Sequence, residues 1–202
     1  MSATLILASA SPRRSELLTQ LGVDFRVHPA DIDESVLKGE SPGGYVERMA
    51  REKAETVAGL YAEADSAILA ADTTVVIDGD VLGKPRDHLD GLAMLARLSG
   101  RTHEVITAIC LAGGSEAASA QVTTRVQFAS LSQATCEAYL ATDEPWDKAG
   151  AYGIQGLAGA FVLRINGSYS NVVGLPLYET WQLLAARGIP TVLNPAGVSV
   201  DE

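Results

Sequence analysis

Basic residues are scarce in this chain of 202 residues, where 15 lysines and arginines stand against 25 aspartates and glutamates and the net charge is −10. Proteins that bind nucleic acid or membrane surfaces need a basic footprint, so the charge balance argues against both partners. Long apolar runs are also missing, and we expect no transmembrane span. The opening stretch MSATLILAS lacks the basic start and the apolar length of a signal peptide, which predicts a cytoplasmic protein.

Cysteines and the common nucleotide-binding motifs are nearly or wholly absent. The two cysteines, Cys110 and Cys136, have no neighbours at metal-ligand spacing, and we expect buried reduced thiols rather than a disulfide or a metal site. The pattern G-x-x-x-x-G-K-[ST] does not occur, so the chain is not a P-loop protein. Nor does G-x-G-x-x-G, which leaves dinucleotide binding with little support. No Ser-His-Asp or Cys-His pattern is apparent either.

The segments that are present alternate between strand and helix patterns. Hydrophobic residues make up 47% of the chain and charged residues 20%, as in ordinary globular proteins. Apolar spacing and end signals predict strands over residues 5–8, 24–28, 67–77, 103–112, 121–128 and 161–165, and helices over 12–21, 42–61, 88–98, 133–141 and 175–187. The sequence DGD at 78–80 predicts a tight hairpin turn. Together these features predict an α/β fold with a mixed sheet, and a loosely ordered tail over 188–202.

A conflict of charge marks the first predicted helix. Ser11 and Pro12 are a typical helix start, yet Arg13 and Arg14 follow at once, where the positive end of the helix dipole disfavours cations. A bound polyanion would resolve the conflict, since free backbone N–H groups and two guanidinium forks between Ser9 and Arg14 suit a phosphate. The alternative is an ordinary capped helix whose arginines turn back to solvent.

Asp72 is a charged residue inside the apolar run ILAADTTVVI. Burying a carboxylate is costly unless it is paired, hydrogen-bonded or bound to a cation. Burial also raises the pKa of a carboxyl group, which would suit a general base. The alternative is a buried aspartate satisfied by backbone donors or a helix end.

Other polar residues carry weaker signals. The acidic stretch Asp31, Asp33 and Glu34 is able to offer a carboxylate to a divalent cation, or is simply a solvated loop. Lys53 lies near the apolar stripe of its predicted helix, and Lys84 lies in a Gly-Lys-Pro loop; both fit either a site or an ordinary surface.

A glycine-rich stretch, AGAYGIQGLAG at 149–159, is the last candidate. Glycines let the backbone approach a ligand closely, and the Gln155 amide both donates and accepts hydrogen bonds, which would allow it to read a base. The alternative is a flexible loop. For His103, in a predicted strand, a structural or surface role is favoured over a catalytic one.

As a set, six segments resemble the Maf family of nucleoside triphosphate pyrophosphatases. The resemblance extends from about residue 5 to 187, and the segments read LASASPRRSELLTQLG, YVERMAREKA, ADTTVVIDGDVLGKPRD, LSGRTHEVITA, DEPWDKAGAYGIQG and INGSYSNVVGLPLYET. The resemblance implies one Maf-like domain over 1–202, an elongated mixed sheet flanked by helices, and two lobes around a deep cleft. It further implies a relation to inosine triphosphate pyrophosphatases.

The resemblance also implies an activity: hydrolysis of a nucleoside triphosphate to the monophosphate and pyrophosphate, with Mg²⁺ or Mn²⁺, by a homodimer. Asp72 matches the family's proton acceptor, and Glu34 and Asp72 match carboxylates near the metal. The positions that match groups around the triphosphate are Ser9, Arg13, Arg14, Lys53 and Lys84. Arg13, Thr73 and Gln155 match positions linked to base choice, and resemble the branch that acts on dTTP and UTP rather than on 7-methyl-GTP.

Two other functions stay open at this point. The family's connection with septum formation and cell-division arrest suits a nucleotide-binding regulator with little catalysis. A phosphatase that releases inorganic phosphate would use the same groups. A role in cleansing the nucleotide pool of modified nucleotides fits the pyrophosphatase.

Overall fold

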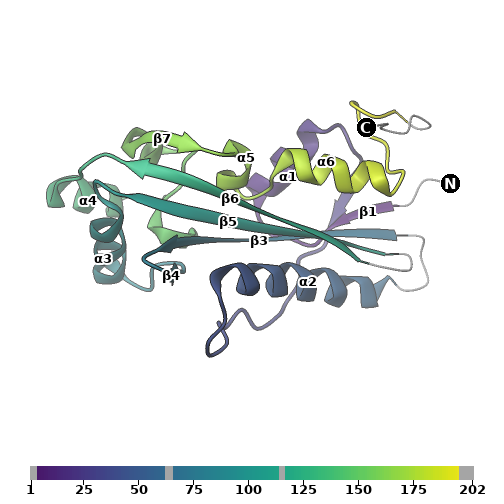
Figure 1. Cartoon of the computed structure of the whole chain (residues 1–202), viewed down its shortest axis with the longest axis horizontal. Coiled ribbons are helices and arrows are strands. Elements are labelled where there is room, and N and C mark those ends of the chain that lie inside the picture. The colour runs from purple at the N-terminus through teal and green to yellow at the C-terminus, as the bar shows by residue number, and fades with distance from the viewer. Residues whose placement is uncertain (1–3, 62–65, 114–116, 196–202) are drawn as a thin grey trace. The chain divides into compact units, whose positions relative to one another are not determined.

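The computed structural model of the chain describes residues 4–61, 66–113 and 117–195 (Figure 1). Its strands form a seven-stranded sheet in the order β2-β1-β3-β5-β6-β7, with β4 paired to β3 off this path. The strands are β1 (Thr4–Leu7), β2 (Phe25–Val27), β3 (Ser66–Ile77), β4 (Asp80–Leu82), β5 (Thr102–Ala112), β6 (Ala118–Phe128) and β7 (Val162–Asn166). Because β1 is parallel to β2 and β3 while β3–β4 and β6–β7 are antiparallel, the sheet is mixed. The predicted α/β class with a mixed sheet is confirmed.

The predicted helices are all present, and the structure adds short ones. The helices are α1 (Pro12–Gln20), α2 (Pro42–Leu60), α3 (His88–Leu98), α4 (Gln133–Leu140), α5 (Tyr169–Val173) and α6 (Leu177–Ala186), with 3₁₀ turns η1 (Ala149–Ala151) and η2 (Leu157–Phe161). Helix α5 was not predicted, because it is too short to show periodicity. The glycine-rich stretch that holds η1 and η2 was predicted to be a loop. No helix among the described residues is both long enough and apolar enough to cross a bilayer.

The chain divides into two compact units. The first holds residues 1–72, 107–122 and 174–202, and the second holds 73–106 and 123–173. The strands β3, β5 and β6 supply residues to both units, with the division in β3 falling just after Asp72. A single two-lobed domain with a deep cleft stays a prediction, and each unit is described by itself.

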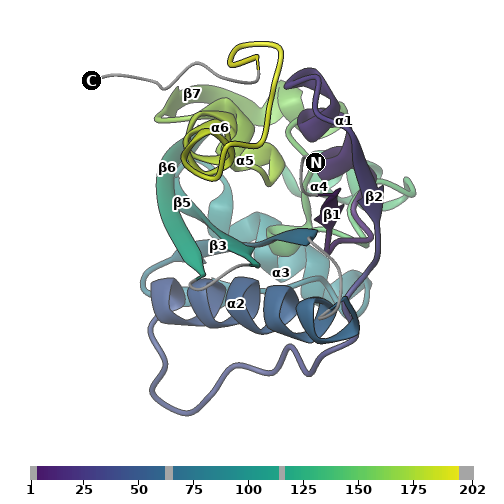
Figure 2. The same cartoon turned by 90° about the vertical axis from the view of Figure 1, so that its right-hand side faces the viewer.

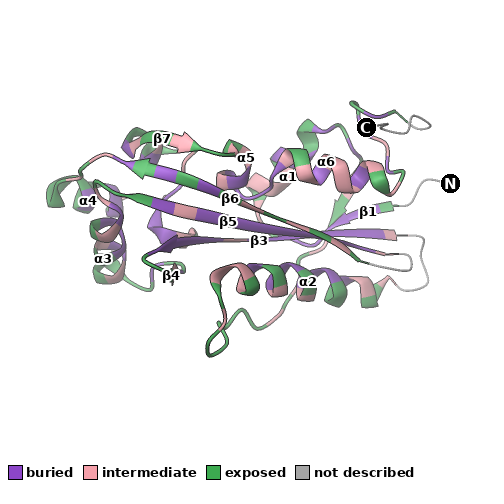
Figure 3. Cartoon of the chain, in the orientation of Figure 1, coloured by how far each residue is buried: buried purple, intermediate pink, exposed green. Residues whose placement is uncertain are grey.

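In the first unit, helices cover both faces of the sheet. Figures 1 and 2 show α2 on one face of the strands and α6 on the opposite face. The α2 side chains at the predicted helical spacing are buried: Val46, Met49, Ala50, Ala54 and Val57. Between these layers, β3 is buried along almost its whole length (Figure 3), as expected for a strand that is apolar on both faces. A polar residue on this strand is therefore shielded from bulk water.

The end of α1 shows why the chain turns there and what holds part of the tail. Gly22, predicted to stop the helix, has φ +64°, a left-handed conformation that glycine adopts without strain. The Val192 N–H donates a hydrogen bond of 3.0 Å to the Leu21 carbonyl, and Thr191 forms a bridge with Asn194. Of the tail predicted to be loosely ordered, residues 188–195 are therefore hydrogen-bonded in part, and 196–202 lie outside the described residues.

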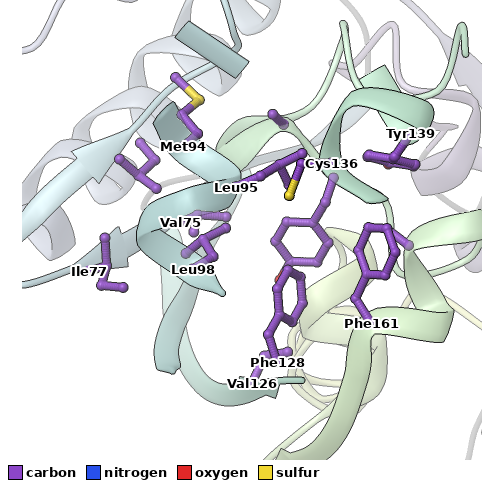
Figure 4. Close-up of a cluster of buried hydrophobic side chains, with 14 of the residues drawn as sticks. Val75, Ile77, Met94, Leu95, Leu98, Val126, Phe128, Cys136, Tyr139 and Phe161 are labelled. Carbon is purple, nitrogen blue, oxygen red and sulfur yellow. The ribbon is translucent and has the colours of Figure 1, made fainter. Parts of the chain in front are cut away.

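The second unit is built around an aromatic core (Figure 4). The rings of Phe128 and Tyr152 meet edge to face at 4.8 Å between centroids, and Tyr139 and Phe161 do so at 5.1 Å. Apolar side chains of α3, among them Leu95 and Leu98, pack into the same cluster. Both cysteines of the chain are free and buried, as predicted.

His103 is a structural histidine of this core, in agreement with the sequence interpretation. It is 2% exposed, and its Nε2 lies 2.8 Å from the Tyr152 hydroxyl oxygen. Its Nδ1 is buried without a hydrogen-bond partner among the described residues. A proton added to the ring would place a charge in an apolar region, and burial accordingly lowers the pKa of His103 from 6.5 to about 4.

We expect His103 to make the protein less stable in mild acid. Below pH 6.5 the unfolded chain protonates this histidine while the folded chain does not, until the pH falls to about 4. The free energy of unfolding should decrease across that window, by about 3 kcal/mol at most. Urea unfolding of the wild type and of His103→Gln between pH 4 and 7 measures this contribution. The exposed His88→Gln serves as control, and an equal pH slope in wild type and His103→Gln would contradict the assignment.

Candidate active site

A buried ion-paired cluster lies in the first unit where α2 faces β3. Asp72 is 7% exposed and Lys53 is 8% exposed. The Lys53 Nζ lies 2.7 Å from the Asp72 Oδ1 and 2.6 Å from the Glu34 Oε1. One ammonium group therefore holds two carboxylates, one from a core strand and one from the acidic loop after β2. The helical spacing that places Lys53 next to the apolar residues of α2 also directs its side chain inward.

The environment of Asp72 alters its proton affinity. Burial raises the pKa of Asp72, and although the charges of Lys53 and Arg14 oppose this effect, the net direction is upward. Glu34 adds a smaller push in the same direction, because two carboxylates close together resist carrying two charges. A carboxylate in this setting is paired and yet inclined to accept a proton.

Arg14 is turned inward, not out to solvent. Its Nε donates to the Gly174 carbonyl at 2.9 Å, and its Nη1 donates to the Ser9 Oγ at 3.3 Å. Burial lowers the pKa of Arg14, and attraction to Asp72 is the largest effect that opposes it. Arg14 is therefore close enough to sense the Asp72 charge. The solvent-exposed alternative does not describe this arginine.

The start of α1 differs in one respect from the sequence prediction. Ser11 occupies the N-cap position, but its side chain makes no capping hydrogen bond. Instead the Ser11 N–H donates to the Ser9 Oγ at 3.2 Å, so Ser9 both receives this amide and contacts Arg14. Arg13 is half-buried next to Arg14, and its positive charge contributes to lowering the pKa of Arg14. Two cations thus share the first turn, as the sequence indicated.

Helix α2 also holds the acidic loop, a role that the sequence analysis missed. The Tyr45 hydroxyl donates to the Glu34 carbonyl at 3.0 Å. The Arg48 Nε and Nη2 donate to the two carboxylate oxygens of Glu40 at 2.6 and 2.8 Å, and Nη2 also donates to the Ser35 carbonyl at 3.0 Å. The available signal was helical spacing, since Tyr45 precedes Lys53 by about two turns. Asp31, Asp33 and Glu34 are all exposed, and it is Glu34 that joins the cluster through its ion pair with Lys53.

The remaining predicted site residues belong to the second unit. Thr73 follows Asp72 on β3 and is half-buried, while Lys84 and Gln155 are exposed. The loops that carry the last two are joined, because the Gly150 N–H donates to the Gly83 carbonyl at 3.0 Å. The roles of Thr73, Lys84 and Gln155 stay predictions.

The described part of the chain contains no group of three His, Cys, Asp or Glu side chains able to hold a metal ion. Glu34 and Asp72 are two carboxylates, and hence two hard oxygen donors, that both contact the Lys53 ammonium group. Mg²⁺ needs only one or two protein carboxylates when waters and substrate phosphates complete its shell. The donor set therefore fits a divalent cation that is shared with a phosphate ligand.

Sequence comparison decides the family. A family model described as Maf-like protein matches residues 4–187, a range that includes every predicted site residue. The chain belongs to the Maf-like family. The resemblance drawn from the six sequence segments is confirmed.

Relatives of this Maf-like protein share one printed name. The dTTP/UTP pyrophosphatase of Anaeromyxobacter sp. (strain Fw109-5) is 54% identical over 202 residues, which cover 98% of this chain and 96% of that protein. The dTTP/UTP pyrophosphatase of Methylobacillus flagellatus is 53% identical over 185 residues, with 92% and 93% coverage. The solved Ham1 protein of Staphylococcus aureus covers 62% of this chain and 71% of its own, with a TM-score of 0.44 and 15% identity. That last similarity is too weak to support an argument.

Proposed function

We propose that this Maf-like protein hydrolyses nucleoside triphosphates, with dTTP and UTP preferred, to the monophosphate and pyrophosphate. The observation that carries the proposal is the buried Asp72 carboxylate held by Lys53 with Arg14 nearby. Relatives at about half identity over nearly the whole chain that bear the name dTTP/UTP pyrophosphatase support the same activity. A nucleotide-binding regulator with little catalysis is the less favoured alternative.

The cations of the first unit suit the polyphosphate. In a protein with a net charge of −10, Arg13, Arg14 and Lys53 lie near one helix start and one buried carboxylate. The hydrogen bonds from Arg14 to Ser9 and Gly174 fix its guanidinium before a ligand arrives, which lowers the entropic cost of binding. Guanidinium groups bind phosphate oxygens through paired N–H donors. In this proposal Lys84 adds a second ammonium group to the triphosphate.

Asp72 is the general base in this mechanism. Its carboxylate takes a proton from a water molecule whose oxygen attacks the α-phosphorus. The new bond joins that oxygen to phosphorus, and the bond from the α-phosphorus to the bridging oxygen breaks, so that pyrophosphate leaves with the electron pair. The raised pKa of Asp72, caused by burial, makes its carboxylate a stronger proton acceptor than a solvated aspartate. Lys53 keeps that carboxylate oriented through its 2.7 Å contact.

Glu34 and Asp72 are the residues that would hold a divalent cation, Mg²⁺ or Mn²⁺. Both offer hard carboxylate oxygens, which suit either metal. When bound, the cation would offset the negative charge that develops on the phosphates. The Tyr45 and Arg48 hydrogen bonds described above hold the loop that carries Glu34.

Base choice is assigned in this proposal to Arg13, Thr73 and Gln155. Gln155 is exposed, and its amide is able to donate to one edge atom of a pyrimidine and accept from another. We also place the protein in the cytoplasm, which two free buried cysteines support, because reduced thiols are usual there. A homodimer is supported by the family resemblance alone.

A triphosphate panel tests the proposed function. Purified protein with Mg²⁺ or Mn²⁺ should release pyrophosphate, and not inorganic phosphate, from dTTP and UTP faster than from purine triphosphates. Removal of the metal with a chelator should abolish turnover, because charge neutralisation dominates phosphoryl transfer. Release of inorganic phosphate alone would indicate a phosphatase. Tight nucleotide binding without any product would indicate the regulator.

A further inference from the structure

The second unit presents Gln155 on a short turn. The Gly156 N–H donates to the Gly153 carbonyl at 3.2 Å, which closes a four-residue turn with Gln155 in the third position. Gln155 is exposed, while Gly153, the first residue of the turn, is buried. A turn rich in glycine has many accessible conformations, so its order must come from contacts outside the turn.

Glu144 supplies those contacts on one side of the turn. Its Oε2 accepts from the Leu157 N–H at 2.7 Å, and its Oε1 accepts from the Ala158 N–H at 3.2 Å. These are the first two amides of η2, which directly follows the turn. Glu144 comes from the segment after α4, so the carboxylate joins two parts of the chain and caps η2 in place of a local side chain.

Tyr139 supplies the contacts on the other side. Its hydroxyl donates to the Glu144 Oε1 at 2.8 Å and accepts from the Gly153 N–H at 3.3 Å. Tyr139 is 4% exposed, and its ring packs edge to face on Phe161 in the aromatic core (Figure 4). The two side chains therefore tie both ends of the Gly153–Gly156 turn to the core of the unit.

The fit between Glu144 and the turn is close, and the carboxylate is held in its charged form. A Cβ placed on Gly156 would lie 2.2 Å from the Glu144 Oε2, too near for any side chain without movement. Burial alone would raise the pKa of Glu144. The hydrogen bonds from Leu157, Tyr139 and Ala158 and the charge of Lys148 outweigh that effect, so its pKa is lowered. Glu144 thus stays an acceptor for all three donors at neutral pH.

We propose that Glu144 and Tyr139 are positioning residues for base selection, because they fix the turn that presents Gln155. The inference rests on the proposed function, which gives Gln155 a base to read. An amide discriminates between bases only when its donor and acceptor are held in register with the base edge, and small displacements are costly. Neither residue is assigned a contact with the nucleotide.

The test compares dTTP with dCTP, whose base edges differ in the order of donors and acceptors. Glu144→Gln replaces one acceptor oxygen with an NH₂ group, a donor that then faces a donor and loses its hydrogen bond. Tyr139→Phe removes the hydroxyl and with it the hydrogen bonds to Glu144 and Gly153. Each variant should lower the ratio of kcat/KM for dTTP over dCTP by about tenfold, mainly through a higher KM for dTTP. The kcat for dTTP should change by less than about threefold, since the residues proposed to bind the phosphates and the proposed general base, Asp72, lie elsewhere in the sequence.

Glu137→Gln on α4 is the matched control, because Glu137 is exposed and its carboxylate accepts from the Gln133 side chain at 2.7 Å, away from the Gly153–Gly156 turn in the sequence. Its dTTP to dCTP ratio should equal that of the wild type. An unchanged ratio in folded Glu144→Gln and Tyr139→Phe, or an equal loss on both nucleotides, overturns the positioning role. If Glu144→Gln does not fold, Tyr139→Phe decides alone. A wild type that releases no pyrophosphate from any triphosphate overturns the proposed function instead, which separates the two failures.

Discussion

Asp72→Asn is expected to keep nucleotide binding while pyrophosphate release falls by on the order of 10²–10⁴-fold. The amide has nearly the same shape as the carboxylate, and its oxygen is still able to accept from the Lys53 Nζ. In the wild type that nitrogen lies 2.7 Å from the Asp72 Oδ1. It is unable to take a proton from water, so the loss should appear in kcat and leave KM nearly unchanged. Steady-state kinetics with dTTP, together with a binding titration, measure the two effects.

Asp24→Asn is the control for this substitution, since Asp24 is exposed and lies after α1, outside the ion-paired cluster. It should behave as the wild type does. Turnover near the wild-type rate in Asp72→Asn would remove Asp72 from the role of base and leave it a structural partner of Lys53.

The same assignment predicts the acid side of the pH profile. The base must be ionised, so activity is present above the pKa of Asp72 and is lost as the pH falls through it. Because burial raises the pKa of Asp72, this loss should occur at a higher pH than that of an ordinary aspartate. A profile of kcat/KM against pH locates it.

Lys53→Met should destabilise the protein by roughly 3–5 kcal/mol, the usual cost of leaving a buried charge without its partner. Methionine keeps the length and apolar character of the lysine stem but removes the ammonium group that contacts Asp72 at 2.7 Å. Asp72 is almost fully buried, so its charge cannot turn to water. Urea unfolding measures the loss. The acid limb of any residual activity should also move to higher pH, since Lys53 lowers the pKa of Asp72.

Two further variants separate ionic effects from packing. The double variant Lys53→Met with Asp72→Asn should recover much of the lost stability, because the charge left behind is then removed. Glu34→Gln should cost less than about 1 kcal/mol, because the Glu34 side chain is 48% exposed and water replaces part of the interaction. If Lys53→Met is as stable as the wild type, or the double variant is no better than the single one, the buried pair does not carry the expected energy.

The elements of the fold were largely predictable from local signals. Helices α2 and α4 begin after Ser41 and Ser132, whose side chains accept from Gly44 and Thr135 at the predicted caps. Such caps and apolar periodicity depend on residues a few positions apart, so the sequence displays them directly. The hairpin at Asp78 and Gly79 follows for the same reason, since both adopt the positive φ that its turn requires.

The glycine-rich stretch before β7 was not predictable in this way. Its glycines give no periodicity, and the order of η2 comes from Glu144, thirteen or fourteen residues away in the chain. Likewise, the acidic loop showed no sign of which carboxylate would pair with Lys53. Glu34 does so because Tyr45 and Arg48 of α2 bind the backbone carbonyl groups of Glu34 and Ser35.

The amino-acid sequence alone determined that this protein alternates strands with helices and that cations gather at the start of α1. It also determined that Asp72 lies in an apolar strand, where a charge needs a partner. The tertiary structure decided which charges meet. Lys53 joins Asp72 to Glu34, and Arg14 turns back to Ser9 and Gly174. The physical reason is that the strength of a charge interaction depends on distance and burial. Both quantities are set by segments that are remote in sequence and adjacent only after folding.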